Sequence, residues 1–462
     1  MVFNYDASDP LAVITAAPPS ETPEQKAARE EREAESRRIS NQIDEELRLH
    51  KADLKKHEQM VKILLLGQSE SGKSTTLKNF RMQFAAENWA KERASWRTVI
   101  QLNLVRSVNA ILDAVKHPDA DDGSKIPLTE KHQLLAIRLS PLRRVEEDLK
   151  RLLGAAANPV EVAVPSSPTR TVSPRPSAEF YVRSWEWQSF VEASQNRSEN
   201  SHPRTRHEGA NSIDISEIIA RCSEDIRELW EDDIIQDMVK RRGLRLEDSA
   251  TFFLNASERI AARDYHPGDD DVLRARLLCR NIVPLSWTSN LASDGKTLTW
   301  KLYDVGGSRT QRQAWLPYFE QVTAIIFLAP ISCFDERLAE DPRVNRLEDS
   351  FILWKAICSS QLLKSTTMII FLNKIDLLAK KIANGVMVRQ FLPSYADRPN
   401  ETKAVVKYLK TKFRDTARNY SPEPRTCHIY ATTVVDTHET AQILVSVRDG
   451  IMREHLKKAT LM

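Results

Sequence analysis

Eight residues constrain the fold of this chain more than any others: Gly67-Gln68-Ser69-Glu70-Ser71-Gly72-Lys73-Ser74. They follow an apolar run from Met60 to Leu66 and precede a helical pattern from Thr75 to Gln83. A buried strand, a G-x-x-x-x-G-K-S loop and a helix form a P-loop, whose backbone N–H groups and helix N-terminus bind phosphate. We expect Lys73 to reach the β- and γ-phosphates of a nucleotide and the Ser74 hydroxyl to bind Mg²⁺. A chance match in a surface turn is the alternative, and the flanking strand and helix weigh against it.

Composition excludes several classes of protein. The 462 residues allow two or three domains, and 67 basic against 64 acidic residues give a net charge of only +3. We therefore expect no general attraction to nucleic acid. The five cysteines are scattered without metal-ligand spacing, which suits a reducing compartment. The longest apolar runs, Val322 to Ile331 and Met368 to Leu372, are too short to cross a bilayer.

The N-terminal region predicts no membrane signal of its own. It has no signal-peptide core, residue 2 is Val, and no cysteine precedes Cys222, so we expect neither secretion nor a direct lipid anchor. Residues 1–23 are rich in Ala, Pro and Ser and are expected to be disordered. Residues 24–59 predict one long charged helix with a thin apolar stripe. The stripe alone fits either a helix resting on its own domain or a docking helix for a partner.

The segment 85–270 predicts an all-α domain. Its helical patterns cover Trp89 to His117, Lys131 to Leu153, Ile215 to Arg242 and Glu247 to Ala262. Two low-complexity stretches, 155–177 and 195–211, interrupt these patterns and are expected to be flexible loops.

Strand patterns return after this helical segment. They cover Ile282 to Trp287, Leu298 to Tyr303, Thr323 to Ala329, Thr367 to Leu372 and His428 to Val434. The first two are joined through Asp294-Gly295, a hairpin turn pair. Apolar strands alternating with helices predict an α/β fold with a mostly parallel, doubly wound sheet. The P-loop strand belongs to that sheet, so residues 60–84 and 271–462 are expected to form one nucleotide-binding domain around the helical insertion.

Two short motifs after strands indicate which base the nucleotide carries. Asp304 to Gly307 is D-x-x-G, in which Asp304 can hold a Mg²⁺ water and Gly307 can offer its N–H to the γ-phosphate. Asn373-Lys374-Ile375-Asp376 is N-K-x-D, whose carboxylate accepts from both N1–H and the exocyclic amine of guanine. Each motif alone is weak, but their order behind a P-loop predicts a guanine nucleotide, GDP or GTP. A P-loop ATPase or kinase is disfavoured by N-K-x-D and by the helical insertion.

With these motifs in place, the chain resembles the α subunit of heterotrimeric G proteins from about Ala27 to the C-terminus. The resemblance rests on segments that match the family's motifs: Leu64 to Gly67, Glu70 to Thr75, Leu246 to Ala250, Asp271 to Arg276, Leu302 to Gly307, Phe319 to Phe327, Leu338 to Asp341, Asn345-Arg346, Phe371 to Asp376 and Thr432 to Thr437. It implies a P-loop GTPase domain with an inserted helical domain, and signal transduction by GTP-dependent switching with Mg²⁺.

The resemblance also assigns roles to individual residues. Arg276 would be the cis arginine that neutralises charge on the transferring phosphoryl group. Leu273 and Arg274 would neighbour the ribose and base, and Ser249 would face the nucleotide from the helical domain. Further nucleotide contacts are implied along the matching motifs at Glu70, Ser71, Gly72, Lys73, Ser74, Thr75, Asp304, Gly307, Asn373, Lys374, Asp376, Thr433 and Val434.

Partners follow from the same resemblance. A G protein βγ dimer would bind the N-terminal helix and a switch II helix that carries Arg309, Arg312 and Trp315. A seven-helix receptor would contact the tail from His455 to Met462, and a downstream effector would complete the pathway. These partners would hold a cytoplasmic protein at the inner face of the plasma membrane.

Departures from the family cluster where the γ-phosphate would be sensed. Ser308 replaces the glutamine that orients the attacking water, and its hydroxyl is too short to bridge water and phosphate. Cys279 replaces the switch I threonine that binds Mg²⁺, an ion that prefers hard oxygen ligands, and Arg280-Asn281 replace Thr-Gly beside it. Pro342-Arg343 replace two acidic residues in switch III. We therefore expect tight guanine nucleotide binding and slow GTP hydrolysis. The alternative is a nucleotide-bound pseudo-GTPase that acts by binding βγ or a receptor.

Overall fold

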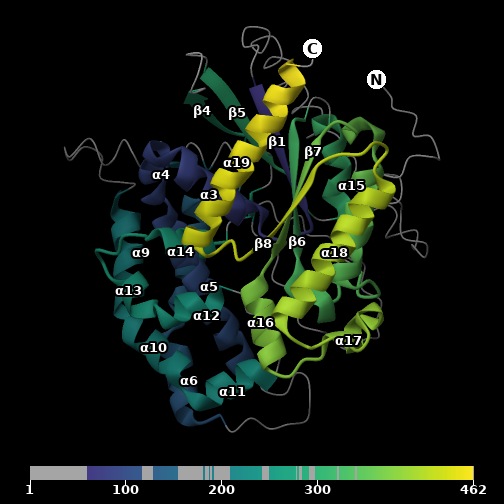
Figure 1. Ribbon diagram of the computed structural model, residues 1–462. Coiled ribbons are helices and arrows are strands. Elements are labelled where there is room, and N and C mark those ends of the chain that lie inside the picture. Colours follow the sequence, from purple (N-terminus) through teal and green to yellow (C-terminus); the bar gives the residue numbers. More distant parts are fainter. Residues whose placement is uncertain are drawn as a thin grey trace, which may run out of the picture. The chain divides into compact units, whose positions relative to one another are not determined.

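The computed structural model describes residues 60–116, 128–154, 181–182, 187, 190–191, 209–241, 249–276, 278–279, 284–290, 297–307, 309–319, 322–338 and 341–460 (Figure 1). The expected N-terminal segments 1–23 and 24–59 and the loop 155–177 lie outside these residues. The chain divides into two compact units, one made of residues 1–85 and 281–462 and the other of residues 86–280. In the described part, no helix is both long enough and apolar enough to cross a membrane.

The first unit is built on a six-stranded sheet of order β4-β5-β1-β6-β7-β8. The strands are β1 (Met60–Gly67), β4 (Pro284–Asn290), β5 (Thr297–Asp304), β6 (Ala324–Pro330), β7 (Thr367–Asn373) and β8 (Cys427–Thr432). Every neighbouring pair is parallel except β4 with β5, which form the expected antiparallel hairpin. The predicted mostly parallel α/β sheet is therefore confirmed.

The central strands are apolar along most of their length, rather than alternating with polar residues, because both of their faces are covered. Along β1, Leu64 and Leu66 enter one core, whereas Ile63 and Leu65 enter the other. Figure 1 shows the two helical layers, with α15 and α18 on one face of the sheet and α3 and α19 on the other. The helices of this unit are α3 (Lys73–Phe84), α15 (Arg346–Ser359), α16 (Ile375–Ala383), α17 (Val388–Phe391), α18 (Thr402–Tyr420) and α19 (Thr437–Thr460), with short 3-10 helices at Arg309–Tyr318 (η1), Ile331–Asp335 (η2), Gln361–Leu363 (η3) and Pro393–Tyr395 (η4).

The second unit is almost entirely helical. Its helices are α4 (Ala86–Arg93), α5 (Trp96–Lys116), α6 (Glu130–Arg138), α7 (Leu142–Leu152), α9 (Gly209–Arg221), α10 (Ser223–Glu231), α11 (Asp233–Arg241), α12 (Ala250–Asn255), α13 (Ser257–Ala261) and α14 (Asp269–Arg274). The long helix α5 lies at its centre and contacts α6, α7, α12, α13 and α14.

Several sequence boundaries need correction. The expected helix from Lys131 to Leu153 is two helices, because Pro141 has no backbone N–H to continue α6 and instead precedes α7. The pattern from Trp89 to His117 is likewise divided into α4 and α5. Helix α9 already begins at Gly209, inside the stretch 195–211 that was expected to be a loop.

The helical unit also extends further along the chain than the expected boundary near Asp271. It ends at Arg280 because α14 packs on α5 and Asn103 binds the backbone of Arg276 in both directions. A short parallel pair, β2 (Tyr181–Val182) with β3 (Leu278–Cys279), lies in the same unit, so the insertion is not purely α-helical.

Candidate nucleotide-binding site

The P-loop connects the carboxyl end of β1 to α3 through two glycines with positive φ. Gly67 has φ +144° and Gly72 has φ +101°. A Cβ at Gly67 would lie 2.4 Å from the carbonyl oxygen of Leu328, so only glycine fits. The N-cap residue of α3 is Gly72, which has no side chain to cap the helix, so an anion could approach the N-terminal end of α3. The loop therefore has the backbone geometry of a phosphate site.

Asn373, at the end of β7, connects the P-loop to the other predicted base-binding segment. Its Nδ2 donates to the carbonyl oxygen of Ser71 at 2.8 Å, and its Oδ1 accepts from the N–H of Val434 at 3.2 Å. The fit is close, because a Cβ on Gly72 would lie 2.3 Å from Nδ2 of Asn373. Asn79, on α3, donates to the carbonyl oxygen of Val434 at 2.8 Å. Three segments that are far apart in the sequence thus meet at one edge of the sheet, and we call this contact the Asn373 junction.

The residues that follow Asn373 present a carboxylate beside this junction. Lys374 adopts a left-handed conformation with φ +67°, and α16 begins directly after it. Asp376 lies half-buried in the first turn of that helix. Thr433 follows β8, the neighbouring strand in which Thr432 pairs with Asn373. Asp376, Thr433 and Val434 therefore come from adjacent loops at the carboxyl ends of adjacent strands.

Lys73, the lysine expected to bind phosphate, is buried beneath the P-loop. Its Nζ donates to the carbonyl oxygens of Gly67 at 3.0 Å and Gln68 at 2.6 Å. Burial lowers the pKa of Lys73 to about 8, an effect that Asp304 partly offsets and Arg312 increases. Nucleotide phosphates at this position would favour the charged ammonium group.

Gly307 leaves room for the same lysine. A Cβ there would lie 2.4 Å from Nζ of Lys73 and 2.4 Å from the carbonyl carbon of Gln68. The D-x-x-G segment therefore approaches the P-loop so closely that no larger residue fits without movement.

Ser74 and Asp304 offer the oxygen ligands that Mg²⁺ prefers. The Ser74 hydroxyl donates to Oδ2 of Asp304 at 2.8 Å. Burial raises the pKa of Asp304, and the nearby Lys73 opposes that rise. Mg²⁺ commonly takes one or two protein oxygens and completes its octahedron with water and phosphate, so this pair fits the ion. The described residues contain no cluster of three or more His, Cys, Asp or Glu that would hold a metal alone, and the side chain of Cys279 lies outside them.

A buried polar network beside the P-loop was not predicted from the sequence. Arg312, on η1, pairs with Asp349, on α15, at 2.5 Å, and both side chains are 3% exposed. Gln68 of the P-loop donates through Nε2 to Oδ2 of Asp349 at 2.5 Å and to the carbonyl oxygen of Arg346 at 2.8 Å. One signal was present, since Asp349 stands one helical turn before the buried Leu353 and so lies on an apolar helix face.

Two of the three side chains on η1 that were expected to contact βγ are buried in the structure. Arg312 is buried by its ion pair, and Trp315 is buried with its Nε1 donating to the carbonyl oxygen of Gly306 at 2.8 Å. In this conformation neither side chain is available to grip a partner. The side chains of Ser308 and Arg309 lie outside the described residues.

The remaining expected site residues belong to the helical unit. Arg276 is half-buried, with its backbone N–H donating to Oδ1 of Asn103 at 2.6 Å. Leu273 is buried, and the guanidinium of Arg274 lies 4.5 Å from the ring centroid of Phe252. Ser249 is half-buried and directly precedes α12.

Asp271 positions α14, the helix that carries Leu273 and Arg274, a role that the sequence analysis missed. It accepts two hydrogen bonds from Arg259 at 2.6 and 2.7 Å, one from the Tyr265 hydroxyl at 2.8 Å and one from the N–H of Gly268 at 2.9 Å. Burial alone would raise the pKa of Asp271, but these hydrogen bonds hold it below its ordinary value. The carboxylate thereby fixes the start of α14.

Fold and site together define a P-loop nucleotide-binding protein with a helical unit inserted after the first strand and helix. A family model described as the G-protein alpha subunit matches residues 37–451. The chain belongs to this family, whose members bind guanine nucleotides, hydrolyse GTP and interact with βγ dimers, receptors and effectors.

Individual relatives resemble the chain along nearly its full length. The guanine nucleotide-binding protein alpha-4 subunit of Mycosarcoma maydis is 29% identical, and the alignment covers 99% of this chain and 96% of the relative. A guanine nucleotide-binding protein subunit alpha of Coprinellus congregatus is also 29% identical, with 87% and 90% covered. The G(o) subunit alpha of Geodia cydonium is 27% identical, with 94% and 98% covered. The resemblance inferred from the motifs is confirmed.

Proposed function

We propose that this G protein α subunit is a GDP/GTP switch that couples a seven-helix receptor to a downstream effector and hydrolyses GTP slowly. The observation that supports its nucleotide site most directly is the position of Asn373, which is hydrogen bonded to both Ser71 of the P-loop and Val434. This junction holds the phosphate-binding and base-binding loops in a fixed register. A guanine nucleotide would then span them, with its phosphates at the N-terminus of α3.

The proposed phosphate contacts come from the P-loop and from Gly307. Glu70, Ser71, Gly72 and Thr75 would surround the phosphates, and Lys73 would contact the β- and γ-phosphates. Mg²⁺, when bound, would offset the negative charge of the phosphates. Ser74 and Asp304, whose oxygens lie 2.8 Å apart, would hold that ion.

Base selection is assigned to Asp376. Its carboxylate would accept from both N1–H and the exocyclic amine of guanine, with Lys374, Thr433 and Val434 supporting the ring. Adenine has no matching pair of donors, so the wild-type protein should bind GDP far more tightly than ADP.

Competition between GDP and ADP for a fluorescent guanine nucleotide tests this assignment. Asp376→Asn should lose most of the preference for guanine, because an unmatched charged hydrogen-bond pair costs on the order of 1.5–3 kcal/mol or more. Equal affinity of the wild-type protein for the two nucleotides would refute the guanine assignment.

Slow hydrolysis follows from the residues that stand where the γ-phosphate would be sensed. Arg276 would neutralise charge on the transferring phosphoryl group, with Ser249, Leu273 and Arg274 placed beside the nucleotide. Ser308 would leave the attacking water unpositioned, and a thiol at Cys279 would be a poor ligand for Mg²⁺.

The replacements in switch III would also weaken its response to bound GTP. Arg343 forms an ion pair with Asp341 at 2.9 Å, so its guanidinium group is bound within switch III itself. This local pair supports the idea that switch III holds switch II loosely when GTP is bound.

The second candidate is a nucleotide-bound pseudo-GTPase whose role is to bind βγ or a receptor. The same replacements at Ser308 and Cys279 favour it, because they would also fit a site that does not hydrolyse GTP at all. A single-turnover assay separates the two candidates, since only the slow switch releases phosphate with a measurable first-order rate.

The βγ dimer and the receptor would attach the protein at the inner face of the plasma membrane. Segment 24–59 would bind βγ, and the tail from His455 to Met462 would contact the receptor. Fractionation of cells that lack βγ tests this route, and tight membrane association of the protein in those cells would argue against it.

A further inference from the structure

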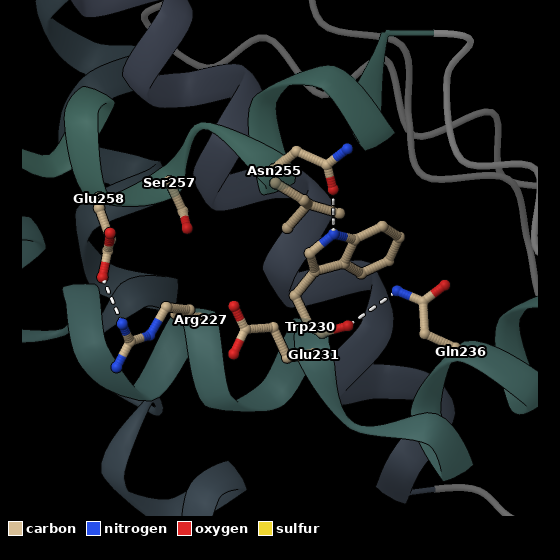
Figure 2. Close-up of a pocket in the computed structure, with 8 residues that line it drawn as sticks. Arg227, Trp230, Glu231, Gln236, Asn255, Ser257 and Glu258 are labelled. Carbon is tan, nitrogen blue, oxygen red and sulfur yellow. Dashed lines mark hydrogen bonds and ion pairs between the residues drawn. The ribbon is translucent and has the colours of Figure 1, made fainter.

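A polar pocket in the helical unit has no place in the nucleotide chemistry. It has a volume of about 350 Å³, and its lining comes from α10, α11, α12 and α13. The lining residues are Arg227, Trp230, Glu231, Gln236, Leu254, Asn255, Ser257 and Glu258 (Figure 2). None of them belongs to the P-loop, D-x-x-G or N-K-x-D motifs, so the nucleotide site gives no reason for the pocket.

Two polar groups face this pocket without partners. Figure 2 shows the Glu231 carboxylate and the Ser257 hydroxyl directed into the space between the Arg227–Glu258 pair and Trp230. Within the described part of the chain, neither side chain has a hydrogen bond or an ion pair. Ser257 is only 2% exposed, so its hydroxyl has little access to water other than through the pocket. A ligand in the pocket could therefore form a hydrogen bond with this hydroxyl in place of water.

The neighbouring groups explain why Glu231 is left unpaired. Arg227 lies one helical turn before Glu231 on α10, where it could form an ion pair with it. Instead, Nη1 of Arg227 binds Oε1 of Glu258 at 2.8 Å. The pocket thus contains two carboxylates and one guanidinium, which leaves one negative charge in excess.

The two amide side chains of the lining are both hydrogen bonded to Trp230. Gln236 uses its Nε2 to donate to the carbonyl oxygen of Trp230 at 2.7 Å, which leaves its Oε1 available as an acceptor. Asn255 accepts from Nε1 of Trp230 at 2.6 Å and so holds the indole in place beside the pocket. The fixed indole and Leu254 supply the apolar part of the lining.

We infer that this pocket binds an arginine side chain of a partner protein. A guanidinium group is planar, carries five donors and is positively charged, so it matches an acceptor-rich lining with one excess negative charge. It can form two hydrogen bonds to the Glu231 carboxylate, donate to Ser257 and lie against the indole of Trp230. An ammonium group has neither the planar shape nor the paired donors for this arrangement.

A peptide titration on the full-length protein tests the inference. The probe is an N-acetylated, C-amidated Gly-Arg-Gly peptide, and the readout is the ¹⁹F NMR signal of 5-fluorotryptophan at Trp230. The chain has nine tryptophans, so the signal is assigned by its loss in Trp230→Phe. We expect a saturable shift with a Kd of about 1 mM, as befits one side chain. Peptides with lysine or with the neutral analogue citrulline should bind at least about fivefold more weakly.

Matched variants locate the interaction. Glu231→Gln removes the charge from an exposed position and should weaken binding about five- to tenfold, and Ser257→Ala should weaken it about threefold. Glu224→Gln makes the same charge change at an exposed position on α10 outside the pocket, and its affinity should stay within about twofold of wild type. No shift at about 10 mM peptide, ten times the expected Kd, would overturn the inference. Equal binding of the three peptides, or unchanged binding by Glu231→Gln, would overturn it as well.

Discussion

Gly72→Ala should separate the P-loop from the base-binding loop, because the substitution has two independent costs in free energy. The first is backbone strain, since Gly72 has φ +101° and an L-residue in the left-handed region costs about 1–2 kcal/mol. The second is contact, since the new Cβ would lie 2.3 Å from Nδ2 of Asn373 and 3.1 Å from Cγ2 of Val434. Asn373 would have to give up its buried hydrogen bond to Ser71, at a cost of about 1–3 kcal/mol.

Gly385→Ala is the matched control. Gly385 has φ +83° but no heavy atom within 4 Å of its hypothetical Cβ, so this substitution adds strain without contact. The difference between the two variants isolates the contact at Asn373. We expect about 1–3 kcal/mol, or roughly 5- to 160-fold in the dissociation constant for GDP. Equilibrium titration with a fluorescent GDP analogue measures it. If both variants bind GDP within threefold of one another, the Asn373 junction does not hold the nucleotide site together.

Two further predictions concern buried carboxylates. Asp349→Ala should lower the free energy of unfolding of the GDP-bound protein by about 3–5 kcal/mol in chemical denaturation, because it leaves the buried Arg312 unpaired. The double variant Arg312→Met/Asp349→Leu should recover most of that loss, and a double variant as unstable as Asp349→Ala would contradict this explanation. The hydrogen bonds that hold the pKa of Asp271 low stabilise the folded state above the ordinary carboxyl pKa of about 4, and this stability is lost as the pH falls below that value. Asp271→Asn should therefore unfold more readily than wild type at pH 7, with the difference shrinking towards pH 3, and an equal difference at both pH values would refute the assignment.

The sheet and the nucleotide motifs were predictable because their signals are local. The run from Met60 to Leu66 is apolar at every position but Lys62, which predicts a strand covered on both faces, and β1 occupies the centre of the sheet. The motifs ending at Ser74, Gly307 and Asp376 each follow a strand, and parallel strands bring their carboxyl ends to one edge.

The features that the sequence did not predict depend on contacts between residues that are far apart in the chain. Gln68 and Asp349 are 281 positions apart, and nothing near either residue in the sequence specifies the other. Arg312 was expected at the surface because charged residues seldom lie buried, and only the carboxylate of Asp349 makes its burial possible. The end of the helical unit at Arg280 depends in the same way on Asn103, which is 173 positions from Arg276.

Single-turnover GTP hydrolysis, compared between the wild-type protein and Ser308→Gln, tests the account of a slow switch most directly. The protein is loaded with GTP, Mg²⁺ starts the reaction, and phosphate release is followed to completion. Restoring a side chain that can position water should raise the rate by about tenfold or more. Arg276→Ala should then cost little in the wild-type protein and much in the Ser308→Gln background. A wild-type protein that hydrolyses GTP as fast as Ser308→Gln would contradict the account, because some other residue would then orient the attacking water.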